Sequence, residues 1–82
     1  MSDTRVAVVS IVVENRDSTE RLNAVLHGYG EYILGRMGIP YKAKGISVLS
    51  VVLDAPAEVI NALTGKLGML DGVTAKTLFS KF

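Results

Sequence analysis

Residues 31–54 of the chain, EYILGRMGIPYKAKGISVLSVVLD, contain two predicted strands joined by a polar turn that ends in a glycine. The second strand, residues 46–53, carries apolar side chains on both faces, because successive Cβ atoms of a strand point to opposite sides. Both faces of such a strand have to be covered by other parts of the protein. A chain of 82 residues has room for only a couple of helices, so we expect a second copy of the protein to supply part of the cover.

Two further strands and two helices are predicted outside this stretch. Residues 6–13 form a Val-rich run typical of a buried strand, and residues 73–80 favour a final strand. The first helix is expected to begin with a side-chain cap at Asp17 or Ser18, and the second with a capping carboxylate at Asp54. Apolar residues follow at helical spacing in both helices: Leu22, Val25, Leu26 and Tyr29 in the first, and Val59, Ile60, Leu63 and Leu67 in the second.

This order of elements predicts one α+β domain over residues 1–82, with the ferredoxin-like βαββαβ fold. Right-handed crossovers place both helices on one face of a four-stranded antiparallel sheet, with the first and third strands at its centre. The other face is bare, and we predict that it forms the interface of a homo-oligomer, a dimer or a tetramer. Its residues on the two central strands are Val6, Val8, Ser10, Val12, Ile46, Val48, Ser50 and Val52. The alternative is that the tail, Lys81 and Phe82, and nearby loops shield this face.

Composition and motifs exclude several classes of function. The net charge is +1, with nine Lys and Arg scattered among eight Asp and Glu, so direct nucleic acid binding is not expected. There is no cysteine, which excludes thiolate metal sites and a cysteine nucleophile. No apolar run approaches the ~20 residues that span a bilayer, and a signal peptide pattern is absent, so we expect a cytoplasmic protein without a membrane partner. Residues 44–48 are aliphatic where RNA-binding domains of this architecture display aromatics, and residues 15–18 make a poor phosphate-cradling loop.

Four stretches of the sequence, spread over nearly the whole chain, resemble one family. They are GRMGIPY at residues 35–41 with KGIS at 44–47, NALTGKLG at 61–68, and the Gly-Val pair at 72–73. They are similar to the iron-only hydrogenase system regulator family. The resemblance implies an ACT-like regulatory module that pairs through its sheet or its edges and often binds a small ligand near the interface.

That family is in turn similar to the carboxy-terminal domain of nickel-responsive ribbon-helix-helix repressors. Only five residues precede the strand that begins at Val6, so we expect no DNA-binding arm, and a role in transcriptional regulation would need a protein partner. The nickel-binding histidines of those repressors lie on the third strand, where this chain has Val52 and Asp54. His27 stands near the end of the first helix, where the dipole favours a cation. We therefore predict no metal site and no cofactor.

Arg36 is the strongest candidate for contact with a ligand. It lies between Gly35 and Gly38, whose missing side chains allow a ligand or another backbone to approach, and we predict that Met37 and Tyr41 complete an anion or metabolite site at the subunit interface. The alternative is an edge-strand arginine that prevents aggregation or pairs with Glu14, Glu31 or Asp54 of its own chain or of a second copy.

Two further sets of polar and aromatic residues have two readings each. Asn61, Thr64 and Lys66 either form a polar pocket or end a helix. Tyr29 and Tyr32 are predicted to be core and rim residues, and the alternative is that they are platforms for stacking. No catalytic constellation stands out, so an enzyme is not expected. The predicted function is a homo-oligomeric regulatory protein that senses a ligand, and the alternative is a structural adaptor for another protein without a small-molecule ligand.

Overall fold

The computed structural model describes residues 3–82 and has the predicted order of elements. The strands are β1 (Arg5–Val13), β2 (Ile33–Tyr41), β3 (Ile46–Ala55) and β4 (Val73–Phe79), and the helices are α1 (Thr19–Gly28) and α2 (Ala57–Gly68). Short 3-10 turns at Arg16–Ser18, Gly30–Tyr32 and Lys42–Lys44 join these elements. None of the helices in residues 3–82 is both long enough and apolar enough to cross a bilayer.

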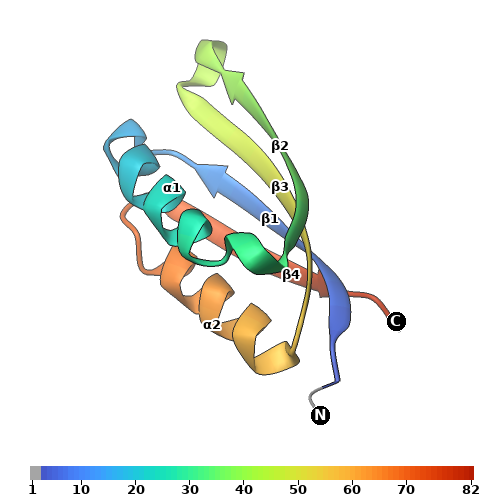
Figure 1. The fold of residues 1–82 in the computed structure, drawn as a ribbon. Coiled ribbons are helices and arrows are strands. Elements are labelled where there is room, and N and C mark those ends of the chain that lie inside the picture. Colours follow the sequence, from blue (N-terminus) through green and yellow to red (C-terminus); the bar gives the residue numbers. More distant parts are fainter. Residues whose placement is uncertain (1–2) are drawn as a thin grey trace.

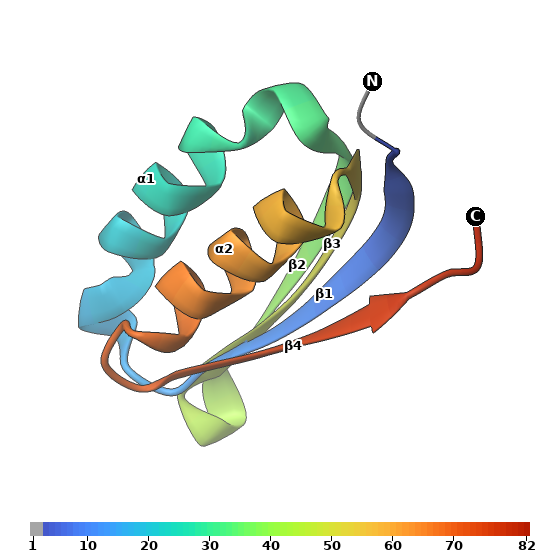
Figure 2. The ribbon, with the colours of Figure 1, turned by 90° about the horizontal axis from the view of Figure 1, so that it is seen from below.

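The strands form one antiparallel sheet in the order β2-β3-β1-β4, which confirms the ferredoxin-like fold. The two helices lie side by side over one face of this sheet (Figure 2). The β2–β3 hairpin continues past the helix layer, and the turn at its tip lies away from both helices (Figure 1). For this reason, most of β2 is exposed.

The core lies between the sheet and the helices, as the alternation of side chains predicts. From Ala7 to Val13 in β1 and from Leu49 to Ala55 in β3, odd-numbered residues point toward the helices and are buried, and even-numbered residues are not. The helices contribute their apolar stripes, including Leu22, Leu26, Ile60, Leu63 and Leu67, which are at most 1% exposed. The chain thus buries the helix side of its two central strands over most of their length.

The opposite side of the sheet, called here the open sheet face, has no helix over it (Figure 2). All eight predicted interface residues lie on it, since β1 and β3 pair so that Val8 is opposite Val52 and Ser10 is opposite Ser50. The edge strands extend it with Gly35, Met37, Ile39 and Tyr41 of β2 and with Thr74, Lys76 and Leu78 of β4. Phe82 does not shield this face, because the residue is 89% exposed.

The helix caps differ from the prediction. Asn15 caps the 3-10 turn ahead of α1 by accepting a hydrogen bond from the Asp17 amide at 3.0 Å. Ser18 instead donates its hydroxyl to the Asp71 carbonyl at 2.6 Å, because it faces the loop before β4. Asp54 lies within β3, and α2 starts after Pro56 without a side-chain cap. Ser18 is the N-cap residue of α1, as predicted, but makes no side-chain capping bond. The predicted caps at Asp17 and Asp54 are wrong.

Candidate functional site

The residues predicted to form one ligand site lie on two faces of β2. In the register with β3, Gly35 is opposite Val52 and Met37 is opposite Ser50, which puts both on the open sheet face. Tyr41 pairs with Ile46 and lies there too. Arg36 and Gly38 are opposite the buried Val51 and Leu49 and point to the helix side. The five residues consequently do not form a single site.

Arg36 borders a cleft between α1 and the β2–β3 hairpin, called here the Arg36 cleft. The guanidinium donates a hydrogen bond to the Asn23 side-chain oxygen at 3.1 Å. Within residues 3–82 of one chain, Arg36 turns toward α1 and does not form the alternative ion pair with Glu14, Glu31 or Asp54; pairing with a second copy stays a prediction. The cleft has a volume of about 240 Å³ and is lined by Val13, Thr19, Leu22, Asn23, Arg36, Gly38, Ile39, Pro40, Ser47 and Leu49.

The lining of the Arg36 cleft combines an apolar floor with a few hydrogen-bonding groups. Thr19 and Asn23 are one turn apart on α1 and so lie on the same side of the helix. Ser47 adds a hydroxyl from β3. A guanidinium has five N–H donors, so one bond to Asn23 leaves donors for a carboxylate or a phosphate, whose geometry matches its fork.

Gly38 keeps the Arg36 cleft open. A Cβ atom at Gly38 would stand 3.6 Å from Leu49 Cγ, an ordinary contact, and it would project toward the helix side of the strand. The glycine is thus not needed for the backbone conformation. Its missing side chain leaves space above Leu49.

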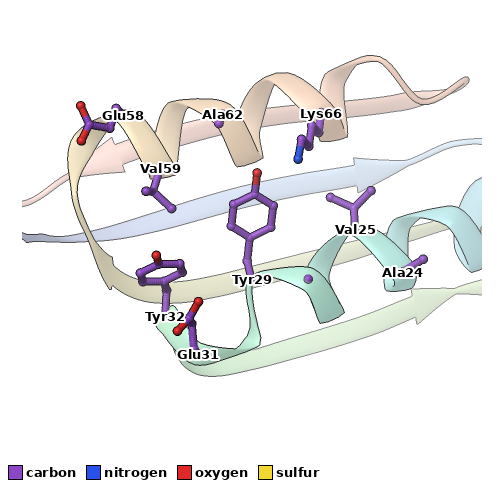
Figure 3. A pocket seen from close by; sticks show the side chains of 10 residues that line it. Ala24, Val25, Tyr29, Glu31, Tyr32, Glu58, Val59, Ala62 and Lys66 are labelled. Carbon is purple, nitrogen blue, oxygen red and sulfur yellow. The ribbon is translucent and has the colours of Figure 1, made fainter.

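A second and larger hollow, the tyrosine groove, lies between the second half of α1, with the turn that follows it, and helix α2 (Figure 3). Its volume is about 550 Å³. Tyr29 stands in the middle of it, and the Lys66 ammonium lies 5.1 Å from the centroid of the Tyr29 ring. The lining residues are Ala24, Val25, Gly28, Tyr29, Glu31, Tyr32, Glu58, Val59, Ala62 and Lys66.

The tyrosine groove was not predicted as a site. The sequence suggested a polar pocket from Asn61, Thr64 and Lys66, but only Lys66 lines the groove, and the Thr64 hydroxyl bonds to Thr77 on β4. The signals available were the two tyrosines after α1 and the lysine on α2. Which turns of the two helices face each other depends on how they pack, and a single sequence does not show that.

Metal-ligating residues do not gather in the part of the chain that the structure describes. No group of three or more His, Cys, Asp and Glu side chains there is placed to hold a metal ion. His27 lies exposed in the last turn of α1.

Comparisons with known proteins point to one family. The sequence model of the TM1266-like family, described as "Iron-only hydrogenase system regulator, putative", matches residues 5–77. The solved structure of the uncharacterized protein TM1266 from Thermotoga maritima is similar to this chain, with 38% sequence identity and a TM-score of 0.91. The match covers 96% of this chain and 100% of that one. No curated protein matches.

Proposed function

Because this chain belongs to the TM1266-like family of iron-only hydrogenase system regulators, we propose that it is a homo-oligomeric regulatory protein that senses a small anionic metabolite. The ligand binds in the Arg36 cleft, and a second copy covers the open sheet face. The observation that carries the proposal is Arg36 itself. It borders a cleft on the helix side of an edge strand, and Asn23 is its one hydrogen-bond partner in residues 3–82.

The lining of the Arg36 cleft supports a small ligand with a carboxylate or phosphate group. Arginine holds such groups with two parallel hydrogen bonds, and Thr19, Asn23 and Ser47 offer further polar contacts. Pockets that bind drug-sized ligands have volumes of roughly 300–1,000 Å³. A cleft of about 240 Å³ therefore suits a smaller metabolite. These groups bind and orient an anion without an obvious general base, and we propose a sensor instead of an enzyme.

The open sheet face supports the assembly. Met37 is 65%, Ile39 58% and Leu78 72% exposed. They lie next to the valines that β1 and β3 place on this face, of which Val48 is exposed and the others are half-buried. Four strands at a spacing of ~4.8 Å and a length of ~30 Å give a footprint of roughly 550 Å². Side chains standing on that footprint increase its accessible area toward the roughly 800 Å² per partner of a standard interface. A face-to-face pair of copies would remove these apolar side chains from water.

Neighbouring residues on opposite faces of β2 allow the two halves of the proposal to be tested separately. Native mass spectrometry of the protein from its own host reports the number of copies and any retained metabolite. Arg36→Ala should lose that metabolite and the rise in Tm on adding small carboxylates or phosphate esters, with the oligomer intact. Met37→Lys, one residue along the strand, should disrupt the oligomer.

Other outcomes would contradict the proposal. A wild-type oligomer that retains no metabolite, and whose Tm does not respond to any anion, supports the structural adaptor. An Arg36→Ala protein that still binds the anion places the ligand elsewhere. A monomeric wild-type protein at micromolar concentration removes the assembly.

A further inference from the structure

We infer that the tyrosine groove is a second binding site and that its ligand is an organic cation, an amine or a guanidinium on a short apolar body. The groove and the Arg36 cleft lie toward opposite ends of α1. The first is lined by residues from Ala24 to Tyr29 and the second by Thr19, Leu22 and Asn23. The two sites are therefore separate, and this inference does not depend on anion sensing.

Two aromatic rings provide the surface that a cation requires. Tyr29 and Tyr32 are half-buried and pack against the edge of the core, so each is held in place from below. In Figure 3 both side chains extend into the space between the chain after α1 and helix α2. The face of an aromatic ring carries a negative potential that attracts ammonium and guanidinium groups.

Lys66 shows that an ammonium fits against this surface. Its Nζ atom lies 5.1 Å from the centroid of the Tyr29 ring, within the roughly 6 Å over which cation–π attraction acts. The residue is exposed and its stem is flexible, so the ammonium can move away at small cost. Lys66 therefore occupies the ring in the free protein and competes with an incoming cation.

The fixed charges around the groove also favour a cation. Glu31 and Glu58 line the end where Tyr32 lies, and Lys66 lines the other end (Figure 3). Two carboxylates against one ammonium leave a net charge of −1 on the lining. The groove also lies at the carboxyl end of α1, where the helix dipole carries a negative partial charge. At the amino end of α2, the carboxylate of Glu58 offsets the positive partial charge of that helix.

The remaining wall suits a short apolar body. The apolar lining comes from both helices, with Ala24 and Val25 on α1 and Val59 and Ala62 on α2. A ligand that places its cation near the tyrosines and carboxylates would lay its apolar part along this wall. An anion would meet two like charges and only one ammonium.

The test is a titration of the isotopically labelled protein with phenethylamine, followed by NMR. The amine is positively charged at neutral pH, and 2-phenylethanol and phenylacetate are its neutral and anionic counterparts. We expect the amide signals of Gly28 and Ala62 to shift with saturation on adding the amine. Affinity should be roughly threefold or more weaker for the alcohol. The acid should not bind.

The variants predict changes in affinity of opposite sign. Lys66→Gln should strengthen amine binding several-fold, because it removes the competitor and a like charge. Glu31→Gln with Glu58→Gln should weaken it several-fold, and so should Tyr32→Leu. Lys76→Gln removes the same charge from the open sheet face and should leave the affinity unchanged. The same spectra show whether each variant is folded.

Three results would overturn the inference. The first is that the amine produces no saturable shift, or shifts only signals from other parts of the chain. The second is tighter binding of phenylacetate than of the amine. The third is weaker amine binding in a folded Lys66→Gln protein, which would make Lys66 a ligand contact instead of a competitor.

Discussion

At the residue scale, Gly72 is the position where the backbone most clearly requires glycine. Its φ is +69°, and a Cβ atom there would lie 2.6 Å from Asn15 Cβ and 2.9 Å from the Asn15 backbone nitrogen. Gly45 has a similar φ of +65° with nothing within 4 Å of such an atom. We expect Gly45→Ala to lower the free energy of unfolding by about 1–2 kcal/mol, and Gly72→Ala by clearly more. Urea unfolding measures both losses of free energy. Equal losses would show that Asn15 moves aside at little cost in free energy.

Gly38 provides a prediction about binding at the same scale. Gly38→Val should keep the fold, because a Cβ atom meets Leu49 only at ordinary contact distance and valine suits a strand. The added methyl groups should fill the Arg36 cleft and abolish the rise in Tm that an anion produces. Gly35→Val is the matched control, since it lies on the same strand but on the open sheet face. Undiminished anion binding by Gly38→Val would place the ligand outside the cleft.

At the scale of elements, a pair of hydroxyls links α2 to β4. Thr64 donates to the Ile60 carbonyl at 3.0 Å, so it accepts its other hydrogen bond from Thr77. Thr64→Val should lower the free energy of unfolding by about 1 kcal/mol, because the Thr77 hydroxyl loses its partner in a half-buried place. The double variant, Thr64→Val with Thr77→Val, should lose less free energy of unfolding than the two single variants lose in sum. Urea unfolding of all four proteins checks this, and additive losses would contradict the link.

The same scale shows what the sequence could predict. The faces of β1 and β3 follow from strict alternation, because residues such as Val9 and Val51 must be buried. On β2, however, a bulge between Ile33 and Gly35 shifts the alternation by one residue, and nearly every side chain is exposed. Alternation alone puts the neighbours Arg36 and Met37 on opposite sides of β2, but the sequence could not show which of the two faces the helices. The tyrosine groove depends on how the two helices pack, so the sequence could not predict it either.

At the scale of the whole molecule, the proposed assembly should make stability depend on protein concentration. A domain of 82 residues buries only about 60–65% of its unfolded surface, so apolar area covered by a second copy is a large part of its stability. When unfolding is coupled to dissociation, Tm rises with protein concentration. Calorimetry at several concentrations should show this rise, and a constant Tm would indicate a monomer that is stable alone.

A charge near the centre of the open sheet face should separate the copies. Ser50 of β3 lies there, opposite Ser10 of β1. In a dimer with two-fold symmetry, the open sheet face of one subunit packs against the same face of the other. An added lysine would lose its hydration in this interface and would lie near the equivalent lysine of the second subunit. Ser50→Lys should therefore give a folded monomer by light scattering, with a Tm that no longer depends on concentration.

The matched control is Asn61→Lys, which adds the same charge to an exposed position of α2 and should leave the oligomer intact. A Ser50→Lys protein that stays oligomeric would show that the copies meet elsewhere. The surface to test would then be the exposed edge of β2, where backbone groups not paired with β3 can extend the sheet into another chain. A lysine at position 50 would not prevent pairing through this edge. Its side chain projects from the open sheet face, whereas edge pairing uses backbone groups in the plane of the sheet. The size of the assembly and the response to Ser50→Lys together therefore distinguish face-to-face from edge-to-edge pairing.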